Sequence, residues 1–148
     1  MAIRKIFQED DPILFKKCRE VTVFDEKLST LIDDMFETMR KSDGVGLAGP
    51  QVGYLRRLAV VECDDDKLEL VNPVIIASSG QQIDEEGCLS VDSHKNCKVL
   101  RPYKVKVKAC DRFGKEFTKE VEGLTARAVC HELDHLDGIL FYTKKYEG

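Results

Sequence analysis

His131-Glu132-Leu133-Asp134-His135 is the stretch of sequence around which the rest of the chain has to be arranged. It is an HExxH pattern, and residues i and i+4 of a helix share one face, so both imidazoles can reach one metal ion. Glu132 points elsewhere on the helix, near enough to handle a proton without filling a coordination position. The alternative is a surface helix whose histidines are incidental, so the rest of a site has to be found in the sequence.

The bulk properties are those of a globular protein with a hydrophobic core. The 148 residues fit one domain, which we expect to span residues 1–148. The net charge of −4 argues against a nucleic-acid partner, because no basic excess is available to neutralise phosphates. The basic row Lys104, Lys106 and Lys108 alternates with apolar residues and therefore predicts the solvated face of a strand.

The sequence predicts a cytoplasmic protein with no membrane contact. It contains no run of eighteen apolar residues, the length that a membrane span requires. The start of the chain, residues 1–11, lacks the apolar segment of a signal peptide. A reducing compartment favours free thiols for the six cysteines, which are Cys18, Cys63, Cys88, Cys97, Cys110 and Cys130.

Two helices and several consecutive strands are predicted. Asp25 is a candidate N-cap for a helix that ends near residues 42–44, and a second helix runs from about Leu124 to His135, with Gly138 as its stop. Strands are expected over 58–62, over 68–76 with an interruption at Asn72-Pro73, over 103–109, and through Phe117 and Val121 after a turn. Because no crossover helices separate these strands, we expect an antiparallel or mixed α+β fold.

A catalytic zinc-type site needs a third protein ligand besides the two histidines. The downstream pattern HExxHxxGxxH holds as far as Gly138, but Phe141 stands where the final histidine should be, and Glu147 is too near the end of the chain to be a good ligand. The third ligand must then come from upstream, and the residues leave Cys88 and His94 as candidates. Taken alone, Cys88 is better explained as a buried thiol and His94 as an exposed loop residue.

The glycine-rich run at residues 44–51 changes this balance. It lacks the Gly-Lys-Ser/Thr of a phosphate-binding loop and does not fit the dinucleotide fingerprint, so alone it predicts only a tight turn. Together, however, residues 44–51, 86–90 and 131–138 resemble the peptide deformylase family, which carries GxGLAAxQ, EGCLS and HExDHLxG in this order. The similarity spans most of the chain, including Glu122-Gly123-Leu124.

The resemblance implies a fold and a metal. The expected fold is the α+β deformylase fold, with the metal-binding C-terminal helix packed centrally among antiparallel or mixed sheets. Cys88, His131 and His135 would bind one divalent ion, with ferrous iron expected and zinc, nickel or cobalt as alternatives. The implied activity is hydrolytic removal of the formyl group from the N-terminal formyl-methionine of newly made proteins, with release of formate.

The resemblance also implies roles for other residues. Glu132 would be the general base, and the Gln51 side chain and the Leu89 backbone N–H would donate hydrogen bonds to the oxyanion. An apolar slot would accept the methionine side chain, and glycine backbone would pair with the extended peptide. The substrate-binding residues implied are Gly44, Val45, Gly46, Glu86, Leu124 and Ala128.

The chain departs from the commonest family pattern at four places. Gly49 replaces an alanine and should loosen the first motif, Asp92 stands where proline is common, and Cys130 replaces a frequent glutamine. The sequence stops at Gly148, so transient ribosome association would have to occur without the further C-terminal helix of longer relatives.

Two other functions compete with formyl-group removal. One is cleavage of internal peptide bonds, which the missing downstream ligand argues against. The other is a structural metal site or a metal carrier, with Cys130 or His94 as a fourth ligand.

Overall fold

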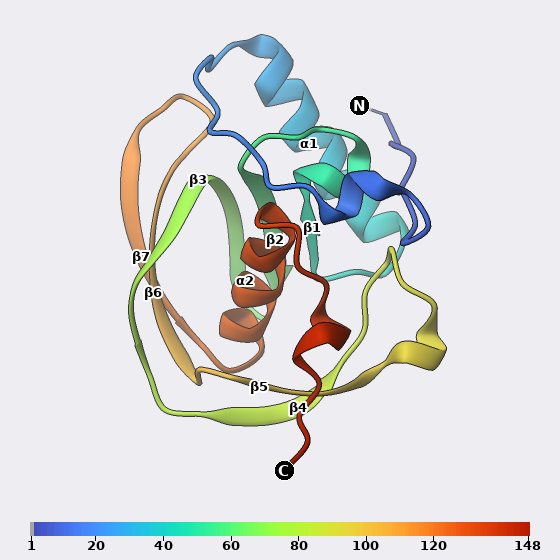
Figure 1. The fold of residues 1–148 in the computed structure, drawn as a ribbon. Helices are drawn as coiled ribbons and strands as arrows, with labels where there is room; N and C mark the ends of the chain where they lie inside the picture. The colour runs from blue at the N-terminus through green and yellow to red at the C-terminus, as the bar shows by residue number, and fades with distance from the viewer. Residues whose placement is uncertain (1) are drawn as a thin grey trace.

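The computed structural model describes residues 2–148. Met1, the first residue of the segment that lacks signal-peptide character, lies outside the described residues. Helix α2 (Gly123–Leu136) lies at the centre of the fold, and helix α1 (Glu26–Lys41) packs on the other side of the sheet (Figure 1). The strands are β1 (Gly46–Ala48), β2 (Leu58–Cys63), β3 (Asp66–Ser79), β4 (Gln82–Glu86), β5 (Cys97–Arg101), β6 (Lys104–Cys110) and β7 (Glu116–Glu122). Short 3-10 turns occupy η1 (Pro12–Phe15), η2 (Gly49–Val52), η3 (Ser93–Lys95) and η4 (Phe141–Lys144).

The strands form two antiparallel sheets. A five-stranded sheet has the order β1-β2-β3-β6-β7, and β4 and β5 form a separate two-stranded sheet. The two sheets wrap around α2, which is the last long element of the chain (Figure 1). The predicted α+β fold with a central C-terminal helix is confirmed.

Strand β2 separates the two main parts of the core. Successive side chains of a strand point to opposite faces, and both faces of β2 are buried. Leu58 and Val60 pack in the cluster with α1, whereas Val61 and Cys63 pack in the cluster with α2. This explains why the strand is a continuous apolar run instead of an alternating one.

Helix α1 begins where the sequence predicts. The Asp25 side chain accepts a hydrogen bond from the backbone N–H of Leu28 at 3.0 Å, which satisfies one of the free donors at the helix start. The buried face includes Ile32, Met35 and Met39, in the predicted 3, 4 spacing. The helix therefore follows its own amphipathic pattern and lies with its apolar face on the sheet.

Strand β3 continues through the predicted interruption at Asn72-Pro73. The register with β6 shifts between Val71 and Val74, so the two residues form a bulge and the strand resumes beyond it. Pro73 has no N–H to donate, and Asn72 adopts a positive φ of 52°. The Asn72 side chain instead bonds the backbone of Val21, at 2.8 Å to its N–H and 3.0 Å to its carbonyl.

Three strands were not predicted from the sequence. The glycine-rich run forms strand β1 followed by the turn η2, whereas its composition alone predicts only a tight turn. Strands β4 and β5 are largely exposed and carry few apolar residues, so they show no clear alternation. Their main buried side chains, Glu86, Val99 and Arg101, include two charged residues, which a hydrophobic pattern cannot reveal.

The predicted alternation of β6 and the predicted free thiols are confirmed. Val105, Val107 and Ala109 of β6 are buried, while the intervening lysines lie on the solvated face. All six cysteines are free thiols. Within residues 2–148, every helix is too short or too polar to cross a bilayer.

Asp34 of α1 anchors the N-terminal segment. Its buried carboxylate accepts hydrogen bonds from the Ala2 N–H at 2.7 Å and from Arg4 Nε at 2.9 Å. Burial favours the neutral acid, but these hydrogen bonds and the Arg4 charge outweigh it and lower the pKa of Asp34. A lowered pKa stabilises the fold above the ordinary carboxyl pKa, and this stabilisation is lost as the pH falls through the folded-state value.

We predict that Asp34→Ala lowers the free energy of unfolding at pH 7 by about 1–3 kcal/mol, because the hydrogen-bond donors of Ala2 and Arg4 lose a charged acceptor. Urea unfolding at pH 7 measures the loss, which should shrink at acid pH. The matched control is Asp33→Ala, which removes a half-exposed carboxylate paired with Arg112 and should cost at most about 1 kcal/mol. Equal losses in the two variants would contradict the assignment.

Candidate metal centre

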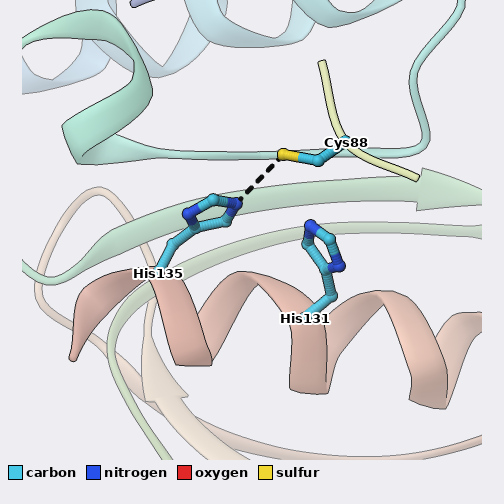
Figure 2. A group of neighbouring side chains, drawn as sticks. All are labelled: Cys88, His131 and His135. Atoms are coloured by element: carbon cyan, nitrogen blue, oxygen red, sulfur yellow. Dashed lines mark hydrogen bonds between the residues drawn. The ribbon is translucent and has the colours of Figure 1, made fainter. Parts of the chain in front are cut away.

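Helix α2 presents two imidazoles to the interior. His131 and His135 are 8% and 1% exposed, and their ring centroids lie 5.1 Å apart with the planes inclined at 67°. One helical turn separates them, as the HExxH spacing predicts. Figure 2 shows a ring nitrogen of each on the side that faces Cys88.

Cys88 joins these two rings from a distant part of the chain. It follows β4, and its sulfur lies 3.4 Å from Nε2 of His135. One potential ligand atom from each of Cys88, His131 and His135 lies within 4.8 Å of the others. The other upstream candidate, His94, is exposed in the turn η3, where its Nδ1 is 2.8 Å from Asp92. The structure therefore brings Cys88 to the histidines and leaves His94 on the surface.

The three side chains fit a divalent cation. One sulfur and two imidazole nitrogens form a donor set that suits zinc, iron and related ions. Nδ1 of His131 is occupied by Glu86 at 2.9 Å, which leaves Nε2 for the side that faces Cys88. A carboxylate behind a histidine is a common way to fix the ring of a metal ligand.

Glu86 is held from three sides in the protein interior. Its carboxylate accepts two hydrogen bonds from Arg101, at 2.8 and 2.9 Å, and one from Arg127 at 2.5 Å, besides its contact with His131. Burial would raise the pKa of Glu86, but the hydrogen bonds from Arg101 and His131 lower it to about 2. The sequence predicts Glu86 as a substrate contact. In the structure, it borders the cavity while its oxygens are engaged by protein groups.

The two imidazoles differ in their affinity for a proton. Burial opposes the charged form of both, and it lowers the pKa of His135 well below the ordinary value, with the charges of His131 and Arg101 adding to the effect. For His131, the charge of Glu132 and hydrogen bonds with Cys88 and Glu86 outweigh burial and raise the pKa to about 10.

Glu132 is buried beside the same pocket. One of its carboxylate oxygens has no hydrogen-bond partner among the described residues, and burial raises the pKa of the group to about 7. The strand opposite is β1, where a Cβ on Gly46 would come within 2.9 Å of Cδ of Glu132. The close approach of β1 to Glu132 therefore requires glycine at position 46. The sequence motif alone does not reveal this requirement.

Gln51 is buried between η2 and the Cys88 loop. Its side-chain oxygen accepts from the Ala48 N–H at 2.9 Å, which fixes the orientation of the amide. The amide nitrogen then donates to Oγ of Ser90 at 3.0 Å and, more weakly, to the Cys88 sulfur at 3.5 Å. The sequence-predicted Gln51 therefore lies at the cluster, and its N–H₂ faces Ser90 and the Cys88 sulfur.

A cavity of about 340 Å³ opens beside the cluster. Val45 and Leu124, at 40% and 49% exposed, lie at its mouth, and Ala128 and His131 are buried in its wall. Gly44, Gly46 and Leu89 also border it. The sequence-predicted substrate residues thus surround one cavity.

Arg127, which also borders the cavity, was missed by sequence analysis. Its spacing of four residues before His131 places it on the same helix face, which is the one signal that the sequence offers. A charged residue on that face is ordinarily expected in solvent, so its burial could not be inferred from the sequence.

The departures from the family pattern have different surroundings. Gly49 is buried, and a Cβ there would lie 2.6 Å from the Tyr54 carbonyl oxygen, so the segment is close-packed. Asp92 caps η3 by accepting from the His94 N–H at 3.1 Å. Cys130 belongs to the apolar cluster between α2 and the sheet, where burial raises the pKa of its thiol to about 11. Among the described residues, neither Cys130 nor His94 belongs to the group of side chains that could hold a metal ion.

The chain is similar to known proteins in both sequence and fold. A profile of the polypeptide deformylase family matches residues 3–147. The peptide deformylase of Caldicellulosiruptor bescii is 55% identical over 97% of this chain and 86% of its own length. A crystal structure of a peptide deformylase from Legionella pneumophila is 46% identical, with a TM-score of 0.92 and coverage of 99% of this chain and 88% of that one. The enzyme from Thermotoga maritima is 37% identical, with a TM-score of 0.93 and coverage of 97% and 98%.

Proposed function

The chain belongs to the polypeptide deformylase family, and on this basis we propose that Cys88, His131 and His135 hold the metal ion of its active site. The chain is a metal-dependent hydrolase that removes the formyl group from the N-terminal formyl-methionine of nascent proteins and releases formate. The observation that supports the ligand assignment best is the convergence of one sulfur and two ring nitrogens within 4.8 Å.

We propose ferrous iron as the ion, with zinc, nickel and cobalt able to occupy the same ligands. When bound, a divalent ion supplies Lewis-acid chemistry, which polarises a carbonyl group and lowers the pKa of a coordinated water. The role of Glu86 would be to keep His131 in the orientation that presents Nε2, because its carboxylate occupies Nδ1. Cys88 would act as a ligand and not as a nucleophile.

Glu132 would act as the general base. Its carboxylate would accept a proton from the attacking water as the oxygen of that water bonds to the formyl carbon. It would then give the proton to the departing amine as the C–N bond breaks, leaving formate and a free N-terminus. A pKa of about 7 suits a group that has to take and return a proton near neutral pH.

Gln51 and Leu89 would stabilise the oxyanion formed by water attack. The Gln51 N–H that contacts the Cys88 sulfur at 3.5 Å makes only a weak hydrogen bond, so this donor remains available to a stronger, negatively charged acceptor placed beside the sulfur. The Leu89 backbone N–H follows the ligand Cys88 directly and would be the second donor. Loss of one such donor costs about 10²–10³ in rate in a comparable site.

The substrate would bind as an extended strand in the cavity. Strand β1 lies at the edge of its sheet and pairs only with β2 in that sheet, so Gly44 and Gly46 can offer backbone groups to a peptide. Val45, Leu124 and Ala128 border the cavity and would wall the slot for the methionine side chain. Glu86 would not bond the substrate directly, because its carboxylate is already bonded to Arg101, Arg127 and His131. It would instead hold these side chains in place beside the cavity.

We further propose that the chain acts as one catalytic domain in the cytoplasm, where nascent chains emerge. Contact with the ribosome would be transient. Direct nucleic-acid binding is not expected, given the net charge of −4.

We predict that protein purified and loaded with ferrous iron without oxygen releases formate from formyl-Met-Ala-Ser. Met-Ala-Ser, which lacks the formyl group, should remain intact because neither the Met–Ala nor the Ala–Ser bond is attacked. Enzymatic measurement of formate and mass analysis of the peptides distinguish the two reactions. Cleavage between the residues at a rate similar to formate release would instead support a metallopeptidase.

We predict that Glu132→Ala lowers kcat for formate release by about 10²–10⁴-fold while the bound metal is retained, because the variant loses the proton acceptor but no ligand. Steady-state kinetics and metal analysis of the same preparation provide the test. Glu120→Ala, on the exposed face of β7, is the control and should leave both quantities unchanged. Near wild-type turnover by Glu132→Ala would show that another group is the base.

We predict that Cys88→Ala weakens the binding of Co²⁺, because a direct ligand is removed. Loss of a residue that only hydrogen-bonds to a metal ligand lowers metal affinity by ~10–100-fold, and the loss in Cys88→Ala should be larger. The thiolate-to-cobalt charge-transfer absorption should disappear, and competition with a chelator should measure the affinity. Cys97→Ala, in the neighbouring strand β5, is the matched cysteine control. Retention of one tightly bound Co²⁺ by Cys88→Ala would exclude the sulfur as a ligand.

A further inference from the structure

Lys95 connects three segments that are far apart in the sequence. Its ammonium lies 2.5 Å from Oε1 of Glu9, near the start of the chain, and 4.6 Å from the ring centroid of Tyr142, near the end. Lys95 itself belongs to η3, which follows the loop of residues 87–92 that carries Cys88. We call this loop the ligand loop. The proposed reaction gives the charge of Lys95 no role, so its contacts require another explanation.

Glu9 extends this connection to the ligand loop. Its backbone N–H donates to the Ser90 carbonyl at 2.8 Å, and its Oε2 accepts from the Asp92 N–H at 3.2 Å. The preceding side chain, that of Gln8, donates to the Leu89 carbonyl at 3.2 Å. The part of the ligand loop that follows the cysteine is therefore bonded to two adjacent residues of the N-terminal segment.

The same three segments enclose a small apolar cluster behind the metal centre. Its buried residues include Val91 and Phe141, and Cys88 and Tyr142 pack against it. The Phe141 ring also stacks on the ring of His131, with the centroids 5.7 Å apart. Because packed side chains transmit displacements to their neighbours, a shift of the ligand loop against this cluster would move the sulfur relative to the imidazoles.

The ion pair between Lys95 and Glu9 is partly shielded from water. The two side chains are 36% and 21% exposed. The Tyr142 ring faces the ammonium and adds a cation–π contact. A partly exposed ion pair changes an equilibrium by a few-fold and is weakened by salt. Any role of this pair should therefore have that size and that salt dependence.

We propose that Lys95 and Glu9 are positioning residues, which hold the ligand loop against the N-terminal segment and so keep the Cys88 sulfur beside the two histidines. The inference rests on the proposed function, in which these three ligands bind the metal ion. A ligand that is already in place loses less conformational freedom when it binds, so the ion pair should raise the affinity for the metal.

The experiment measures the affinity for Co²⁺ by competition with a chelator at low ionic strength, with folding of each variant verified by circular dichroism. Lys95→Met retains the apolar stem of the side chain but removes the charge. It should weaken Co²⁺ binding by about 3–5-fold, the size expected of one partly exposed ion pair. Lys95→Arg, which keeps a cation at this place, should recover most of the affinity.

The matched control is Lys98→Met, which removes an exposed lysine of the neighbouring strand β5 and should leave the affinity unchanged. An unchanged affinity in Lys95→Met, or an equal loss in the two variants, would overturn the proposal.

Salt separates the ion pair from a role in packing alone. The distance over which charges interact falls from about 30 Å at 0.01 M salt to about 3 Å at 1 M. The difference in Co²⁺ affinity between wild type and Lys95→Met should therefore shrink over this range. A difference that stays constant would show that the stem or the fold is responsible, and the proposal would be wrong.

Glu9→Gln tests the pair from its other side and should cause a similar loss of affinity. The double variant Glu9→Gln/Lys95→Met should bind Co²⁺ about as well as Lys95→Met alone, because both substitutions break the same contact. Additive losses would show that the two residues act independently and would refute the proposed pairing.

Formate release by the wild-type enzyme tests the function separately. No release from formyl-Met-Ala-Ser would disprove formyl-group removal, while the Co²⁺ affinities would still decide the role of the ion pair. Release by the wild type together with equal affinities in wild type and Lys95→Met would disprove only the positioning role.

Discussion

The carboxylate of Glu86 is the point on which the arrangement of the site depends. It ends β4 and is bonded to Arg101 of β5 and to two residues of α2, His131 and Arg127, so it joins the two-stranded sheet to the central helix. Cys88 lies two residues further along the chain, so the same bonds determine where the sulfur meets the histidines. Removing one partner of a buried ion pair lowers the free energy of unfolding by about 3–5 kcal/mol, so the contacts of Glu86 hold the sheet and the helix together firmly.

Close approach of backbone and side chain is the second constraint on the site. Gly46 leaves room for Glu132, and Gly44 leaves room for Leu89, whose side chain would lie 2.7 Å from a Cβ at position 44. On the other side of the cavity, a Cβ on Gly87 would lie 2.9 Å from the Asn96 side chain. The glycines of the first two motifs therefore matter because they lack a side chain. Each leaves room for a neighbouring side chain at the site, and this role does not depend on backbone flexibility.

The sequence predicts those parts of the protein whose determinants are local. The cap at Asp25, the apolar face of α1 and the HExxH helix follow from spacing alone, and the resemblance to a family identified Cys88 where the residues left His94 open. Strands β4 and β5 were missed because they are held by Glu86 and Arg101, a pair whose bonding depends on contacts between distant segments. Arg127 was missed for the same reason, since its burial depends on acceptors far away in sequence.

The site holds two glutamates whose environments give them opposite properties. Glu86 has arginine and imidazole donors, so its pKa falls to about 2 and it remains a fixed anion. Glu132 is buried without comparable donors, so its pKa rises to about 7 and it can exchange a proton. Environments that push two carboxyl pKa values apart assign separate roles to chemically identical groups. Because Arg127 both holds the fixed carboxylate and borders the cavity, the framework that contacts His131 also shapes the cavity beside it.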